Sequence, residues 1–168
     1  MKKLYELYAP AMLGVCVRYV NDYEKAKDIL QEGFIKVFKK INTYSGGGSF
    51  GGWMRRIFVT TSLEFLRDDH FQQYMDIADY EEKIETVEIS TMEKLSAEEI
   101  LKCISELPKG YRLIFNMFAI EGYSHAEIAN ALNIKEGTSR SQFAHARQLL
   151  QNKIQKLDIC TNAKNKYG

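Results

Sequence analysis

The sequence predicts an all-α protein made of two small helical domains, a three-helix N-terminal bundle and a four-helix C-terminal helix-turn-helix domain, joined by an acidic linker. Apolar residues recur at helical spacing on both sides of that linker. Lys and Arg outnumber Asp and Glu by 11 to 6 over residues 1–67 and by 10 to 5 over residues 100–168, whereas residues 68–99 hold 2 basic and 11 acidic residues. Two basic blocks on an acidic connector are typical of two domains that face nucleic acid. We expect the domains at residues 1–67 and 96–157, the linker at 68–95 and a polar, frayed tail at 158–168.

Composition and residue spacing argue against several classes of protein. The chain has no run of about 18 apolar residues and no basic-then-apolar leader at Met1, so we expect a cytoplasmic protein without membrane insertion. Cys16, Cys103 and Cys160 lie far apart, which indicates reduced thiols rather than a disulfide framework or a zinc site. The three histidines lack metal-ligand spacing, and no Ser or Cys lies in a nucleophile motif. We therefore expect no enzyme activity, no metal, no cofactor and no small-molecule substrate.

Two amphipathic helices are expected at the start of the first domain. The first runs from Lys2 to Val20, and the sequence leaves open whether it restarts at Pro10 or is kinked there. The second follows the capping pair Asn21-Asp22 and runs to about residue 41. On these residues alone, a partner site and an ordinary surface are equally well supported for its outer face, where one aliphatic residue lies among polar ones: Asp28, Gln31, Glu32, Ile35 and Lys39.

A glycine-rich loop, residues 42–52, separates the second helix from the third. Its five glycines cannot hold a helix, and no Gly-Lys-Ser/Thr follows, which excludes a phosphate-binding loop. Tyr44 and Phe50 are candidates for stacking on unpaired bases, a contact worth about 1–3 kcal/mol per base. The alternative is a simple connector whose aromatic rings fold back onto the core. The helix expected from Trp53 to Arg67 adds three cations: Arg55, Arg56 and Arg67.

The second domain contains clear helix start and stop signals. Ser96 and Glu99 have capping-box spacing, and that helix is expected to stop before Pro108. Another helix is expected over residues 109–121, ended by Gly122.

Residues 124–150 predict a helix-turn-helix. Ser124 and Glu127 form a second capping box, Ala126, Ile128, Ala129 and Leu132 are expected to face inward, and Asn133 tolerates the left-handed turn that redirects the chain. The second helix, about residues 135–150, is expected to expose short polar groups and cations that suit phosphates and base edges. An antiparallel helix pair with a solvated side is the alternative, but residues 138–152 contain no acid, unlike most surface helices. The candidate reading residues are Thr138, Arg140, Ser141, Gln142, His145 and Arg147.

The order of three segments resembles the extracytoplasmic-function sigma factors, the group-four sigma family of bacterial transcription initiation subunits. Residues 26–41 match their Ala-x-Asp-x-x-Gln-x-x-Phe helix and read AKDILQEGFIKVFKKI. Residues 50–57, FGGWMRRI, together with Tyr44 resemble the part that melts the minus-ten element and captures a flipped base. Residues 122–147 resemble the minus-thirty-five reader. These segments together cover nearly all of residues 1–157.

The chain also departs from the family's pattern. The family often has Asn where Thr60 stands, Asp where Glu64 stands, and a basic run where this chain has Asp68-Asp69. These changes affect the expected downstream base contacts and not the fold. Ser139 replaces a usual Val, from which we expect slightly looser packing of the recognition helix.

The resemblance implies a sigma factor that binds core RNA polymerase and promoter DNA, is held by an anti-sigma factor and is monomeric when free. It also implies a linker that mimics nucleic acid in the RNA exit path, although the sequence alone supports a plain solvated tether equally well. Two alternatives stay open: a helix-turn-helix regulator that does not bind polymerase, and an interaction module held by an anti-sigma protein. The residues implied for polymerase binding are Asp28, Gln31, Glu32 and Ile35. Those implied for binding and melting the downstream element are Tyr44, Phe50, Trp53, Arg55, Arg56, Thr60 and Arg67.

Overall fold

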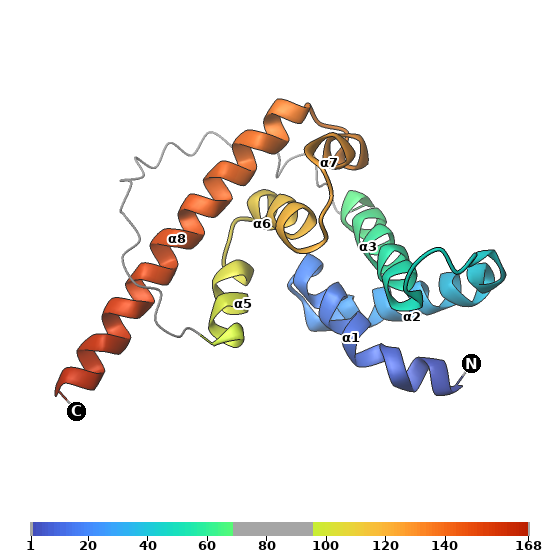
Figure 1. Cartoon of the computed structure of the whole chain (residues 1–168), viewed down its shortest axis with the longest axis horizontal. Helices are drawn as coiled ribbons and strands as arrows, with labels where there is room; N and C mark the ends of the chain where they lie inside the picture. The colour runs from blue at the N-terminus through green and yellow to red at the C-terminus, as the bar shows by residue number, and fades with distance from the viewer. Residues whose placement is uncertain (1, 69–95, 168) are drawn as a thin grey trace. The chain divides into compact units, whose positions relative to one another are not determined.

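The computed structural model describes the backbone of residues 2–68 and 96–167 and the side chains of residues 2–67 and 96–157. The chain divides into two compact units, Met1–Gln73 and Tyr74–Gly168. Within the described ranges the regular structure is helical, with no strand, which confirms the predicted all-α class (Figure 1). The predicted linker, residues 68–95, lies outside the described residues except for the backbone of its first residue.

The first unit is a bundle of three mutually packed helices, α1 (Lys2–Val20), α2 (Tyr23–Lys40) and α3 (Phe50–Asp68). The helix α1 continues through Pro10, which answers the question that the sequence left open. Its inner face buries Met12, Val15, Cys16 and Tyr19. The bundle is therefore built by apolar stripes at helical spacing, as the sequence predicts.

The contact between α2 and α3 is close because Gly33 has no side chain. A Cβ atom placed on Gly33 would lie 2.2 Å from Cε1 of Phe58, whose ring is fully buried. At the start of α2, the Asp22 carboxylate accepts hydrogen bonds from the backbone N–H groups of Glu24 and Lys25, at 3.0 and 3.1 Å. The predicted capping of this helix is thus confirmed.

The helix α3 begins at Phe50, three residues before the predicted start at Trp53. The short 3₁₀ helix η1 (Ile41–Thr43) closes α2, and the loop ends at Ser49, whose hydroxyl accepts a hydrogen bond from the Gly52 N–H at 3.0 Å. Two of the five glycines therefore lie in the first turn of α3. The expectation that glycine would keep this stretch out of a helix was wrong, because the Ser49 cap satisfies the first turn locally.

The second unit contains α5 (Ala97–Ser105), α6 (Lys109–Phe115) continued by a π-helical turn η2 (Asn116–Ile120), α7 (His125–Leu132) and α8 (Glu136–Tyr167). Both predicted capping boxes are present, at Ser96 with Glu99 and at Ser124 with Glu127. Gly122 ends the η2 segment with φ 77°. The four-helix arrangement predicted for this half is confirmed.

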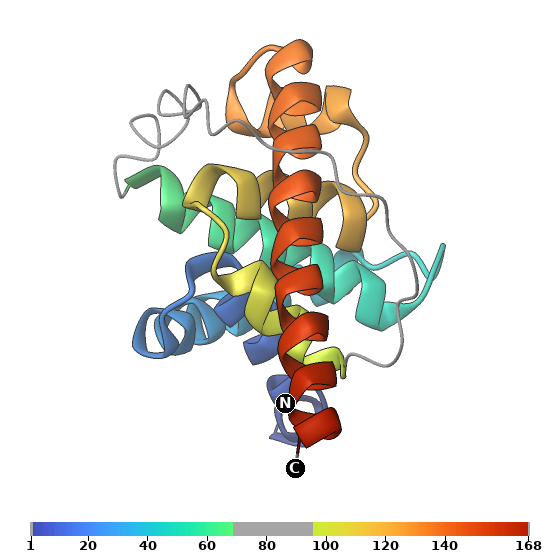
Figure 2. The ribbon, with the colours of Figure 1, turned by 90° about the vertical axis from the view of Figure 1, so that its left-hand side faces the viewer.

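The long helix α8 forms the spine of the second unit, and α5, α6 and α7 pack against it (Figure 2). Its backbone is helical to Tyr167, and the fraying expected from residue 158 stays a prediction. Ile154 and Leu157 pack on the cluster of Cys103, Ile104 and Leu150, which carries the helix past residue 150. An apolar stripe along one face of a helix stabilises the helix wherever the stripe packs against another apolar surface.

The two cysteines with described side chains, Cys16 and Cys103, are buried free thiols, as expected. Burial raises the pKa of Cys16 to about 11. Cys160 lies outside the described side chains. Among the described helices, none is long and apolar enough to cross a bilayer.

Candidate nucleic-acid and partner surfaces

The outer face of α2 presents the four residues that the sequence singles out for a partner. Asp28, Gln31, Glu32 and Ile35 are all exposed, and Ile35 leaves 46% of its surface accessible. The opposite side of the helix buries Ile29 and Phe34. The predicted placement of an aliphatic side chain within a polar surface is therefore confirmed, although its role as a partner site stays a prediction.

The aromatic residues of the glycine-rich loop form a cluster with Trp53. Ring centroids lie 5.2 Å apart for Tyr44 and Phe50, 5.5 Å for Tyr44 and Trp53, and 5.4 Å for Phe50 and Trp53. Tyr8 of α1 lies 5.9 Å from Phe50. The packed rings agree with the alternative in which Tyr44 and Phe50 fold back onto the protein. All three rings remain half-buried, so part of each faces solvent, and their stacking on bases stays a prediction.

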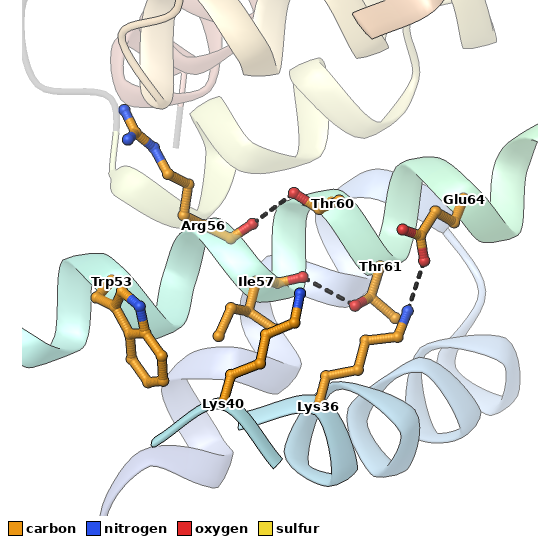
Figure 3. A pocket seen from close by; sticks show the side chains of 8 residues that line it. All are labelled: Lys36, Lys40, Trp53, Arg56, Ile57, Thr60, Thr61 and Glu64. Atoms are coloured by element: carbon orange, nitrogen blue, oxygen red, sulfur yellow. Dashed lines mark hydrogen bonds and ion pairs between the residues drawn. The ribbon is translucent and has the colours of Figure 1, made fainter. Parts of the chain in front are cut away.

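A pocket of about 340 Å³ lies between α2 and α3, next to this cluster. Figure 3 shows two lysines of α2 reaching toward α3, with Trp53 near one end of the pocket and Glu64 near the other. The hydroxyl groups of Thr60 and Thr61 donate to carbonyl oxygens of their own helix, at 2.9 and 2.8 Å. The lining residues are Lys36, Lys40, Trp53, Arg56, Ile57, Thr60, Thr61 and Glu64.

The charges of the pocket are unequally compensated. Lys36 Nζ lies 2.5 Å from Glu64 Oε2 and 3.9 Å from Glu32 Oε1. This ammonium therefore pairs with one carboxylate of α3 and one of its own helix, α2. Within residues 2–67, neither Lys40 nor Arg56 forms a side-chain ion pair with an acid of that range. The pocket thus has a neutralised end at Glu64 and a cationic, aromatic end at Trp53.

The structure brings together only part of the predicted downstream set. Trp53, Arg56 and Thr60 line the pocket, whereas Arg55 and Arg67 do not. Sequence reasoning missed Lys36 and Lys40 as members of the site. Their i, i+4 spacing places them on one face of α2, but only the packing of α3 shows that this face borders a pocket.

The turn of the helix-turn-helix has the predicted geometry. Asn133 adopts the left-handed conformation, with φ 54° and ψ 48°, and the Ile134 N–H donates to the Ala129 carbonyl at 3.0 Å. Ile128, Ala129 and Leu132 are buried as expected, while Ala126 is exposed and was wrongly assigned to the inner face. The αL residue redirects the chain into α8 and satisfies the end of α7.

The exposed side of α8 carries most of the predicted reading residues. Arg140, Ser141 and Arg147 are exposed, and Thr138 and His145 are half-buried. Arg140 forms an ion pair with Glu136 one turn earlier, and the His145 ring contacts Tyr111, with Nδ1 3.4 Å from the phenol oxygen. We call these five residues the α8 reading face.

Gln142 does not belong to that face. Only 2% of its surface is exposed, so its predicted outward position was wrong. Helical spacing places Gln142 in line with Ser139 and Ala146, which are both fully buried. The polar amide of Gln142 suggested a solvent-exposed side chain, but the position of Gln142 on the helix places that side chain in the interior.

A polar contact from Ser139 links the two helices of the motif. Its Oγ lies 2.9 Å from Nδ1 of His125, and the His125 ring stacks on Phe118 with centroids 4.3 Å apart. Burial is the main cause that lowers the pKa of His125, and the nearby Arg140 guanidinium lowers it further, against a smaller opposing effect of Glu136. The slightly looser packing expected from Ser139 in place of a usual Val stays a prediction, and sequence reasoning did not identify His125 as the partner of the Ser139 hydroxyl.

Comparisons with known proteins cover both units. Residues 4–71 match the family model described as Sigma-70 region 2, and residues 97–150 match the model described as Sigma-70, region 4. The ECF RNA polymerase sigma-E factor of Haemophilus influenzae is 29% identical, over 89% of this chain and 85% of that protein. The RNA polymerase sigma-H factor of Pseudomonas aeruginosa is 27% identical, over 89% of this chain and 83% of that protein.

A solved structure shares the fold. The sigma factor RpoE from Bartonella quintana, crystallised with the anti-sigma factor NepR, aligns with a TM-score of 0.55 and 17% identity, over 92% of this chain and 96% of that chain. The region 2 and region 4 matches lie in the same order as the two helical units described above. The chain therefore belongs to the sigma-70 family and, within it, to the extracytoplasmic-function group of RNA polymerase sigma factors.

Proposed function

We propose that this sigma factor binds core RNA polymerase through the outer face of α2 and promoter DNA through the α2–α3 pocket and the α8 reading face. As a sigma factor, the chain directs transcription initiation at promoters. The observation that carries the proposal is the division of α2 into two surfaces. Its outer face exposes Asp28, Glu32 and Ile35, while Lys36 and Lys40 line a cationic pocket against α3.

The polymerase surface is proposed to consist of Asp28, Gln31, Glu32 and Ile35. An exposed aliphatic side chain within acidic and amide groups suits a partner that offers an apolar contact ringed by cations. The four side chains need no rearrangement to become accessible, since all are exposed in the free chain.

The pocket is proposed to hold an unpaired nucleotide of the opened strand. A base would pack against the exposed part of the aromatic cluster, and Lys40 and Arg56 would contact its phosphate, because neither cation is engaged by an acid of the described first unit. Thr60 is proposed to face the same nucleotide. Arg55 and Arg67 lie outside the pocket and are proposed to contact the neighbouring DNA backbone.

The upstream element is proposed to be bound by the α8 reading face, Thr138, Arg140, Ser141, His145 and Arg147. Gln142 is omitted because it is buried. Arg140 and Arg147 lie two turns apart on one exposed side, a spacing that suits contacts along a major groove.

The remaining proposals follow from the family. We expect an anti-sigma factor to bind the chain, because the structurally similar RpoE was crystallised with one. We also propose a cytoplasmic location, where RNA polymerase works, and no catalytic activity of its own. The linker's proposed role in the RNA exit path concerns residues outside those described.

Reconstitution with core polymerase tests the proposal. Run-off transcription from fragmented genomic DNA of the source organism is expected only when the chain is added, and the transcripts should share an upstream sequence. An Asp28→Ala, Ile35→Ala double variant should lose binding to core polymerase. Tyr23→Ala on the same helix is the matched control, since Tyr23 is more exposed than Ile35 yet lies outside the proposed surface. Core binding that survives the double substitution would favour a regulator that does not use polymerase.

A further inference from the structure

A polar contact joins the first helix of the helix-turn-helix to the recognition helix. His125 is the first residue of α7, and Ser139 lies in the first turn of α8. The distance from His125 Nδ1 to Ser139 Oγ is 2.9 Å. We propose that this hydrogen bond is a positioning contact that sets how α8 presents its reading face, so that both residues determine specificity for the upstream element. The inference rests on the proposed role of α8 in DNA binding.

Side chains of two elements, η2 and α8, hold the His125 ring in place. It stacks on Phe118 of η2, with an angle of 13° between the ring planes, and it meets Phe143 of α8 edge-on at 5.8 Å between centroids. Ser139 has no exposed surface. A buried hydroxyl that loses its partner is costly, and water cannot replace the imidazole without space, so the pair is held in one arrangement.

The position of Ser139 explains why this contact matters for reading. The next two residues, Arg140 and Ser141, are exposed members of the reading face. A hydrogen bond to a base edge tolerates only a few tenths of an ångström in length, so a small tilt of the first turn of α8 misplaces both side chains. The residue that fixes that turn from inside therefore acts on specificity without touching DNA.

The surroundings of the imidazole disfavour its protonated form. The charged groups that act on His125 are Arg140 and Glu136, both on α8, while the neighbouring rings of Phe118 and Phe143 carry no charge. Burial and Arg140 oppose protonation and outweigh Glu136. Protonation adds a charge near Arg140 and leaves Nδ1 able only to donate, so acid should weaken the contact, a signature that a purely apolar packing contact lacks.

The test uses full-length protein assembled with core polymerase. A pool of random duplex DNA is first selected by the wild type, and the enriched duplex is then labelled and titrated with wild type, His125→Phe, Ser139→Ala and the double variant. His125→Phe keeps the aromatic stack and removes Nδ1. Each single variant should bind the duplex about three- to tenfold more weakly, as expected for one lost hydrogen bond, and the double variant no more weakly than the worse single.

Three further measurements separate positioning from general damage. Ser139→Thr, which keeps a hydroxyl, should restore binding, and Ser105→Ala, a hydroxyl deletion on α5, should leave it unchanged. Core-polymerase binding should be equal for all variants. Lowering the pH from about 7.5 to about 5.5 should weaken binding more for the wild type than for His125→Phe, since the phenyl ring does not titrate.

Two results would overturn this inference but leave the proposed DNA-binding role of α8 intact. One is single variants that bind the enriched duplex as tightly as the wild type, and the other is a double variant whose loss of binding free energy equals the sum of the two single losses. If the wild type enriches no upstream sequence, the proposed DNA-binding role of α8 fails and the inference fails with it. The two failures are thus told apart by the wild-type selection.

Discussion

Two helical glycines of the first unit predict opposite effects of the same substitution. Gly33 lies in α2, where an added Cβ would come within 2.2, 2.5 and 2.8 Å of three atoms of the Phe58 ring. Gly14 lies in α1, where nothing approaches an added Cβ within 4 Å. Both glycines carry ordinary helical backbone, because neither is among the residues of positive φ. Gly33→Ala and Gly14→Ala therefore differ mainly in the space available.

The magnitudes follow from two competing contributions. Alanine in a helix interior is more favourable than glycine by about 1 kcal/mol, and this gain applies at both sites. At Gly33 the gain is opposed by overpacking, which costs about 1–3 kcal/mol and sometimes more. Phe58 is fully buried and stacks edge-on against Phe34 at 5.2 Å, so its ring cannot move aside without separating the helices. We expect overpacking to win at Gly33 and helix propensity to win at Gly14.

Denaturant unfolding followed by fluorescence measures the difference. Trp53 is the single tryptophan of the chain and lies in the first unit, so its emission reports that unit. Relative to wild type, Gly33→Ala should lower the free energy of unfolding and Gly14→Ala should raise it by at most about 1 kcal/mol. For a domain of this size, each 1 kcal/mol corresponds to about 4–8 °C in Tm. Equal stabilisation by both substitutions would refute the close packing of α2 on α3.

Three further outcomes are expected. Glu64→Gln removes the carboxylate that pairs with Lys36, so Trp53 fluorescence should show tighter binding of a single-stranded oligonucleotide and a steeper salt dependence; unchanged affinity would argue against a cationic pocket. Arg147→Ala should weaken promoter binding and reduce the slope of log affinity against log salt by about 1, as measured by anisotropy at several salt concentrations. The pKa of His125 is lower in the folded than in the unfolded chain, so its contribution to stability is complete above the unfolded value of about 6.5 and is lost as the pH falls through the folded value. Unfolding of the second unit by circular dichroism should therefore depend less on pH below about 6.5 in His125→Phe than in wild type, and identical profiles would contradict this assignment.

Features that depend on neighbouring residues in the chain were predictable from the sequence. The capping boxes at Ser96 and Ser124 and the left-handed turn at Asn133 involve atoms within a few residues of one another, so local chemistry decides them. The same holds for the exposed outer face of α2, because a 3.6-residue period separates it from the buried stripe. The order of the two sigma-70 regions is likewise a property of the sequence.

Features that depend on residues distant in the chain were decided by the tertiary structure alone. Tyr44 and Phe50 turned inward because Trp53 and Tyr8 supply rings to pack on, and Gln142 is buried because its place on α8 meets the core. The pocket lies between two packed helices, and that packing brings Lys36 to Glu64 across 28 positions of the sequence.

The sequence by itself thus determined which segments are helical, where most of them begin, and which family the chain belongs to, since all three are encoded in local patterns. The tertiary structure decided which polar side chains remain available for DNA. Availability depends on what packs against each side chain, and the partner of Ser139 lies 14 residues earlier, on a different helix. A serine hydroxyl has the same local chemistry whether it faces solvent or the interior. Only the helix that packs against Ser139 turns its hydroxyl into a contact between helices.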